Sequence, residues 1–367
     1  MIFIKKLVLL ALCILLITGC GVNKHDTLKS FKDYNAKKET YELTGTMKIV
    51  SNEDEFTYNI NVGVRDNKYY KVSLLNNINN HEQVILRNDE GVFVVTPELN
   101  KSFKFMSEWP NNSSQAYLIE TLVNDVNKDS NTSVKDTENG YEITSKVNYP
   151  NNQKLDHEII TTDKDFNIKK VEVKDVNDNT YIVVEVSKLN YKPKFNNTYF
   201  DLDALVKVED ETKKQEKEEK NKKVDEECLQ TCTDTVDNCN NTCKIESTSN
   251  ILEDIIYPLY VPNDTYLSGK DTVSTDGGNR VILTFSGVDP FILVEEVSSE
   301  YDEMNIIPVN GEPLFLGSTI GAISQNSIYW TSNGVDYYLT SKTLDASEMM
   351  TIAESVQNSS NLVAGLK

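Results

Sequence analysis

Four closely spaced cysteines have the types and spacing most suited to covalent or metal chemistry. Cys228, Cys232, Cys239 and Cys243 follow the pattern C-x₃-C-x₆-C-x₃-C. If each C-x₃-C is a helical turn, its two thiols lie on one side of that turn, and nested disulfides Cys228–Cys243 and Cys232–Cys239 would staple a hairpin. Four cysteines allow three connectivities, so the pairing stays open. A Cys₄ zinc site is the alternative; structural zinc usually uses C-x₂-C pairs, and an oxidising compartment favours disulfides. The pattern therefore favours a disulfide clip.

The N-terminus indicates the compartment. Lys5 and Lys6 precede an apolar run over 7–17, which is shorter than the roughly 20 residues of a transmembrane helix and fits the core of a signal peptide. The run ends in Leu-Ile-Thr-Gly before Cys20, which matches the bacterial lipobox, where the cysteine thiol receives a diacylglycerol. Each buried CH₂ of the acyl chains contributes about 0.8 kcal/mol, so two chains anchor stably. The sequence predicts lipidation at Cys20 and attachment to the cell membrane on its extracytoplasmic face.

Composition and motifs argue against an enzyme and against nucleic acid. The chain carries 37 basic and 57 acidic side chains, a net charge of −20, whereas binding phosphates or anionic lipid needs a surplus of Lys and Arg. His25, His81 and His157 are scattered, which leaves little basis for a histidine-built metal or catalytic site. Glu295 and Glu296 are adjacent in an expected strand and so face opposite sides, which favours a solvated edge. We expect no catalytic residues, no metal and no cofactor.

The length of 367 residues suggests two domains. The segment 209–227 contains almost no apolar residue, which is typical of a linker or a solvated single helix. The expected organisation is a signal peptide (1–19), a tether (20–26), a first domain (27–206), a charged linker with the four-cysteine clip (207–250) and a C-terminal α+β domain (251–367).

Period-two apolar patterns over much of 41–191 predict an antiparallel meander. One helix is expected near 117–126, where apolar side chains form a broad stripe. The run Val92 to Val95 is apolar on both strand faces. That run predicts cover on both sides of the sheet, by a helix on one and by another layer or a partner on the other.

The run YYKVSLLNNINNHEQVILRNDEGVFVVTPELNKSFKFMSEWP, residues 69–110, resembles the central meander of the lipoprotein-carrier superfamily, which includes LolA-like and RseB-like proteins. The resemblance implies a highly curved open antiparallel β-sheet, a half-barrel, closed by a helical lid over a hydrophobic cavity that holds an acyl chain or a hydrophobic peptide. The alternative is a packed core. The resemblance also implies a Gram-positive-type bacterium, because lipoproteins of this layout occur in spore-forming Gram-positive bacteria, where some support sporulation or germination. The candidate cavity residues are Val84, Leu86, Val92, Val94, Phe103, Phe105, Leu118 and Leu122. The family uses an arginine inside the cavity, and neither Arg65 nor Arg87 can be matched to that role.

The C-terminal region has a Gly-rich turn at 276–279 and a final helix. Asp345 is expected to cap that helix, with Glu348 completing a capping box. An apolar stripe follows at i, i+3, i+4 and i+7, comprising Met349, Ile352, Ala353 and Val356. The run SIYWTSNGVDYYLTSKTLDASEMMTIAESV, residues 327–356, is similar to an uncharacterised α+β domain that follows carrier-like domains in Gram-positive lipoproteins. Its aromatic side chains are expected to pack across strands, with a binding platform as the alternative; they are Tyr329, Trp330 and Tyr337.

Two functions remain open on the sequence. The first is a membrane-anchored, non-enzymatic binding or sensor lipoprotein with a LolA-like cavity, acting in envelope maintenance, sporulation or germination. The second is a structural or scaffolding lipoprotein that acts through protein–protein contacts without a small ligand. Both have a membrane as partner through the N-terminal lipid, and either would engage another envelope protein.

Overall fold

The structure is a computed structural model that describes residues 24–364 except 52–53, 207–251, 253 and 276–277. Cys20 and the four linker cysteines lie outside the described residues. The signal peptide, the lipid anchor and the disulfide clip therefore remain predictions.

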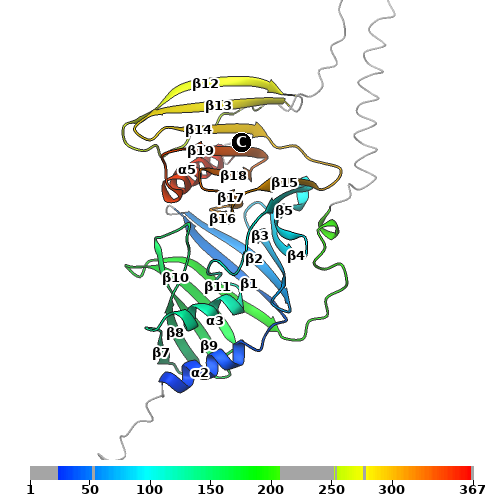
Figure 1. The fold of residues 1–367 in the computed structure, drawn as a ribbon, viewed down its shortest axis with the longest axis vertical. Helices are drawn as coiled ribbons and strands as arrows, with labels where there is room; N and C mark the ends of the chain where they lie inside the picture. The colour runs from blue at the N-terminus through cyan, green and yellow to red at the C-terminus, as the bar shows by residue number, and fades with distance from the viewer. Residues whose placement is uncertain (1–23, 52–53, 207–251, 253, 276–277, 365–367) are drawn as a thin grey trace, which may run out of the picture.

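Two open sheets account for the described β-structure, and they are stacked along the long axis of the molecule (Figure 1). The larger sheet, sheet A, has twelve strands, and its order is β15-β6-β5-β4-β3-β2-β1-β11-β10-β9-β8-β7. Its neighbours are antiparallel except β15 and β6, which are parallel. The strands are β1 (Tyr41–Ser51), β2 (Asp54–Arg65), β3 (Tyr69–Asn76), β4 (Glu82–Asn88), β5 (Gly91–Thr96), β6 (Lys101–Phe105), β7 (Ser133–Asp136), β8 (Gly140–Lys146), β9 (Leu155–Asp163), β10 (Ile168–Asp175), β11 (Thr180–Asn190) and β15 (Asn305–Val309). The prediction of a mainly antiparallel, open sheet with few helices is confirmed.

Alternation of apolar and polar residues sets the inner face of sheet A. Along β2, Phe56, Tyr58, Ile60 and Val62 are buried, while the side chains between them are more exposed. This is the pattern of a strand with one face in the core. Two helices contribute apolar side chains to the same core: α2 (Lys24–Asn35) and α3 (Ile119–Lys128). α2 begins within the segment expected to be a tether.

The outer face of sheet A is covered by the chain that follows β11. Phe93 and Val95 of β5 pack there against Phe200 and Leu202, while Val92 and Val94 belong to the inner core. The expected cover on both faces is thus present within one chain. The short helices η1 (Pro97–Leu99) and η2 (Asp203–Leu205) lie in the adjoining connections.

The smaller sheet, sheet B, has seven antiparallel strands in the order β12-β13-β14-β19-β18-β17-β16. They are β12 (Thr265–Thr275), β13 (Gly278–Gly287), β14 (Phe291–Val297), β16 (Glu312–Leu316), β17 (Thr319–Ile323), β18 (Ser327–Ser332) and β19 (Val335–Ser341). The helix α5 (Ala346–Ala364) covers one face. The β16–β17 hairpin was not anticipated from the sequence.

The final helix packs as predicted. Its stripe residues Met349, Ile352, Ala353 and Val356 are all buried in the core of sheet B. The Glu348 amide donates to Asp345 Oδ1 at 2.9 Å, which confirms the N-cap. The expected return bond of a capping box is replaced, because the Glu348 carboxylate accepts a hydrogen bond from Tyr260 at 2.7 Å.

One strand of the C-terminal region belongs to sheet A. β15 pairs in parallel with β6, from Asn305 opposite Lys101 to Val309 opposite Phe105. The chain therefore crosses from sheet B to sheet A and returns directly into β16. The expected organisation assigned this segment, with the rest of 251–367, to the C-terminal α+β domain, whereas its pairing partner is β6 of sheet A.

Candidate functional site

A cavity of about 380 Å³ lies where the two sheets meet. Its walls come from the end of β1, the start of β11, the loops near 109–115 and 149–155, strand β16 and the first turns of α5. The volume is within the range of about 300–1,000 Å³ that small-ligand sites occupy. The apolar residues on its walls are Ile49, Val50, Ile85, Trp109, Tyr149, Pro150, Leu155, Tyr181, Ile182, Pro313, Leu314, Phe315 and Met350.

Ten polar residues share the walls with these apolar ones: Asn112, Ser113, Gln115, Asn151, Asn152, Lys154, Glu312, Ser347, Thr351 and Glu354. The Gln115 amide is already engaged, because its Nε2 donates to Ser113 Oγ at 2.8 Å and its Oε1 accepts from Tyr117 at 2.6 Å. Glu312 accepts a hydrogen bond from Ser107. Asn112 differs: among the described residues its buried Oδ1 has no hydrogen-bond partner. A ligand N–H or O–H would satisfy that acceptor.

Contacts of the β16–β17 hairpin with sheet A fix the position of the cavity. Gln83 of β4 imitates a strand neighbour: its Oε1 accepts from the Ile320 amide at 2.6 Å and its Nε2 donates to the Ile320 carbonyl at 3.1 Å. Tyr58 donates to the Gly317 carbonyl at 2.5 Å. Gly317 has φ +53°, and a Cβ there would lie 3.0 Å from the Phe56 ring. Glycine therefore permits both the turn and the close approach of the two sheets.

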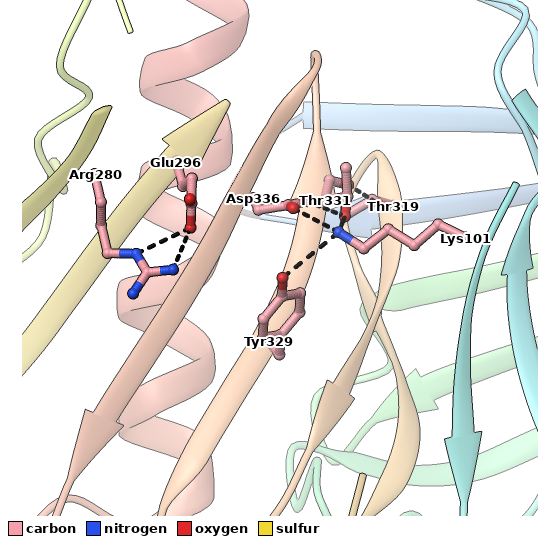
Figure 2. A network of polar contacts seen from close by, with 7 residues as sticks. All are labelled: Lys101, Arg280, Glu296, Thr319, Tyr329, Thr331 and Asp336. Carbon is pink, nitrogen blue, oxygen red and sulfur yellow. Dashed lines mark hydrogen bonds and ion pairs between the residues drawn. The ribbon is translucent and has the colours of Figure 1, made fainter. Parts of the chain in front are cut away.

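A buried ion pair joins the sheets on the other side of this hairpin (Figure 2). Lys101 Nζ of β6 lies 2.5 Å from Asp336 Oδ2 of β19, and the lysine side chain is only 2% exposed. Its ammonium also donates to Thr331 Oγ1 at 3.3 Å and is 3.5 Å from the Tyr329 hydroxyl. Burial lowers the pKa of Lys101, and the attraction of Asp336 opposes that shift. Three polar contacts thus compensate the desolvation of the ammonium.

Three carboxyl groups lie in the first domain away from the cavity walls: Glu120 and Asp125 on α3, and Glu158 on β9. Burial raises the pKa of Glu120 to about 7 and that of Asp125 to about 6. Burial, together with repulsion from Asp125, raises the pKa of Glu158 well above its usual range. Tyr41 donates to Glu120 at 3.0 Å, and Ser145 donates to Glu158 at 3.3 Å. None of the three carboxyls lines the cavity, so they are not placed to act on a ligand there.

The paired glutamates of β14 differ from expectation. They face opposite sides as predicted, but Glu295 is fully buried rather than on a solvated edge. Its Oε2 accepts the Ile256 amide at 3.0 Å, and burial raises its pKa to about 7. Glu296 lies on the other face and binds Arg280 at 2.6 Å (Figure 2). The solvated-edge interpretation was wrong for Glu295, because the segment that enters sheet B covers it. No group of three or more His, Cys, Asp or Glu suited to a metal occurs among the described residues.

The eight candidate cavity residues are all buried, but they divide between the two faces of sheet A. Val84 and Leu86 belong to the outer cluster. The remaining six form part of the inner core with α3: Val92, Val94, Phe103, Phe105, Leu118 and Leu122. None of the eight lines the cavity between the sheets. Their contact with a ligand stays a prediction.

The sequence offered little to identify the walls of the cavity between the sheets. Several of them lie in loops marked by Trp-Pro and Tyr-Pro, at Trp109 and Tyr149. These dipeptides indicate corners without indicating what they face. Neither arginine of the first domain lines the cavity. Arg87 donates to the carbonyls of Glu108 and Trp109, and Arg65 stacks on the Tyr69 ring at 4.3 Å.

The aromatic side chains of sheet B pack across strands. Trp330 and Tyr337 stack with centroids 5.0 Å apart at 11° and are buried. Tyr329 contacts Phe103 of sheet A at 4.9 Å. These rings therefore serve the core and the junction between the sheets.

Comparison with known proteins finds a relative that matches along nearly the whole chain. The sporulation protein YdcC of Bacillus subtilis is 34% identical over 352 residues, covering 95% of both chains. Solved structures that match include the MucA/MucB complex of Pseudomonas aeruginosa. It is 11% identical in sequence, the match covers 90% of this chain and 96% of that chain, and the TM-score is 0.29. Another is a LolA superfamily protein of Nitrosomonas europaea, with 10% identity, 49% and 98% coverage and a TM-score of 0.27.

No protein-family model matches the chain. The TM-scores are low, so the family assignment rests on the sequence identity. Within the described residues, no helix has the length and hydrophobicity needed to span a membrane.

Proposed function

The chain belongs to the same family as the sporulation protein YdcC, and from this premise we propose that it is a non-enzymatic lipoprotein that binds an apolar ligand between its two sheets. In this proposal Cys20 carries the lipid anchor on the extracytoplasmic face. The region 27–206 forms the carrier-like half-barrel, with α2 and α3 as its helical cover. The region 251–367 closes the open end. The role is in the spore or cell envelope, together with another envelope protein.

The cavity at the junction is the observation that carries this proposal. A packed junction would have filled about 380 Å³ with side chains, since protein interiors are close-packed. Instead, open space is bordered by Ile182 of β11, Leu155 of β9 and Met350 of α5. The walls carry thirteen apolar and ten polar residues, and a concave site that combines apolar surface with polar groups is typical of ligand-binding pockets.

The test measures binding of the apolar dye N-phenyl-1-naphthylamine to the purified chain that begins after Cys20. Ile182→Trp places a large ring at the cavity wall and is expected to reduce dye binding at least tenfold. The matched control is Ile292→Trp, because Ile292 is 38% exposed and does not line the cavity. Equal dye binding by both variants, or no binding by the unmodified chain, would favour the structural lipoprotein without a ligand.

A further inference from the structure

The cavity lies along the open edge of strand β16. Leu314 of β16 packs in the core of sheet B, whereas Phe315 packs against the core of sheet A. Successive side chains of a strand point to opposite faces, yet the cavity touches Pro313, Leu314 and Phe315 alike. A space that borders both faces of a strand must lie beside it. β16 is the last strand of sheet B, so this side carries no neighbouring strand.

The register identifies the backbone groups that point into this space. The two-residue turn between β17 and β18 is closed by the Ser324 amide bonded to the Ser327 carbonyl at 2.8 Å. Bonded pairs alternate along an antiparallel ladder. Ser324 bonds toward β18, so every second residue before it does the same. The residues between them, 323, 321 and 319, therefore bond to β16. Their partners are residues 312, 314 and 316.

The groups between those partners face the open side. They are the Phe315 N–H and C=O and the Pro313 C=O. Among the described residues none of the three has a hydrogen-bond partner there. Proline at 313 fits this assignment, because proline in a sheet occurs where its missing N–H would have faced away from the ladder.

We propose that the open edge of β16 binds an extended peptide segment of another protein as an additional strand, with apolar side chains in the cavity. This inference rests on the proposed function, since it names the ligand of the same cavity. An acyl chain would cover the Phe315 N–H and C=O and the Asn112 Oδ1 without bonding to them, and a buried polar group left unsatisfied is costly. A peptide backbone supplies the donors and acceptor that these groups need, as in other cases of strand addition.

Charge indicates which peptides fit best. The cavity walls carry Glu312 and Glu354 against one lysine, Lys154, and the whole chain has a net charge of −20. An apolar segment flanked by basic residues is therefore favoured over one flanked by acidic residues.

The test uses a fluorescein-labelled peptide of alternating valine and threonine flanked by lysines, measured by fluorescence anisotropy with the chain that begins after Cys20. A second peptide has the same sequence with two consecutive central amides N-methylated. Consecutive amides point to opposite edges of an extended strand, so this peptide cannot pair fully on either side. Binding of the first peptide and at least tenfold weaker binding of the second is the expected result.

Two protein variants isolate the backbone donor. Phe315→Ala removes the ring and keeps the N–H, whereas Phe315→Pro removes both. Since Phe315 N–H faces away from β17, the ladder to β17 is retained in each. We expect Phe315→Pro to bind the peptide about tenfold more weakly than Phe315→Ala, while both variants bind the dye equally.

The outcomes separate the two proposals. Equal binding of the two peptides, or equal binding by the two variants, would overturn strand addition and leave the dye-binding cavity intact. Dye binding without any peptide binding would do the same. Failure of both dye and peptide to bind would remove the proposed function together with this inference.

Discussion

Replacing Lys101 by methionine tests the junction between the sheets. The variant keeps a long apolar stem but leaves the Asp336 carboxylate without its cation, whose Nζ lies 2.5 Å away. Removing one partner of a buried pair costs about 3–5 kcal/mol. Asp336 retains 16% exposure and a 2.7 Å bond from Thr331, so the lower end of that range applies. We expect the free energy of unfolding to fall by about 3 kcal/mol.

The assay is thermal and urea denaturation of the chain that begins after Cys20, with Lys135→Met as the matched control. Lys135 also pairs with a carboxylate, Glu142 at 2.8 Å, but its side chain is 75% exposed, and exposed pairs contribute about 0–1 kcal/mol. At roughly 2–4 °C per kcal/mol, the conversion for a cooperative unit of about 150–250 residues, Lys101→Met should lower the melting temperature by about 6–12 °C.

A double-mutant cycle completes this test. In the variant with both Lys101→Met and Asp336→Leu, no unpaired charge remains, so most of the lost stability should return. The reasoning would be refuted if Lys101→Met were as stable as Lys135→Met. It would also be refuted if the two single changes at the junction were simply additive.

Three further predictions concern other parts of the chain. Burial raises the pKa of Glu295 from 4.5 to about 7. Between pH 4.5 and about 7 the folded state therefore holds a proton that the unfolded state has released. The free energy of unfolding falls by about 3 kcal/mol as pH rises through that window. Glu295→Gln should remove this contribution from the fall seen in pH-dependent urea denaturation and leave the part due to Glu120, Asp125 and Glu158. A fall of unchanged size would contradict the assignment. Leu122 is 1% exposed in the inner core, so Leu122→Ala should lower the free energy of unfolding by about 2–5 kcal/mol, measured by thermal denaturation. Asn124→Ala, on the exposed side of α3, should change it little. Similar losses in the two variants would count against the core assignment. Cys20→Ser in the full-length chain should abolish incorporation of labelled palmitate into the protein, and equal labelling of the variant and the unmodified chain would disprove the lipid anchor at Cys20.

Local patterns in the sequence predicted the regular elements well. The alternation along Phe56 to Val64 and the spacing of Met349, Ile352 and Ala353 follow from side chains that must face a core at periods of 2 and 3.6 residues. The two-faced run Val92 to Val95 even indicated that sheet A is covered on both sides. These predictions succeed because each depends on residues adjacent in the chain.

The partners of these elements were decided by the tertiary structure. Residues 305–309 have the pattern of a strand in any sheet, and only packing places them beside β6. Glu295 looks like a surface residue until the segment at Ile256 covers it. The cavity is a further case, since Ile49, Tyr149 and Met350 lie far apart in the chain and meet only at the junction.

The sequence by itself therefore determined the acidic character of the chain and its mainly antiparallel strands, and it predicted a lipidation site at Cys20. Tertiary structure alone decided that the apolar residues under α3 pack together while a cavity remains beside β16. Both kinds of surface consist of the same apolar side chains. Whether such side chains fill a space or border it depends on how two sheets fit together, and no local pattern encodes that fit.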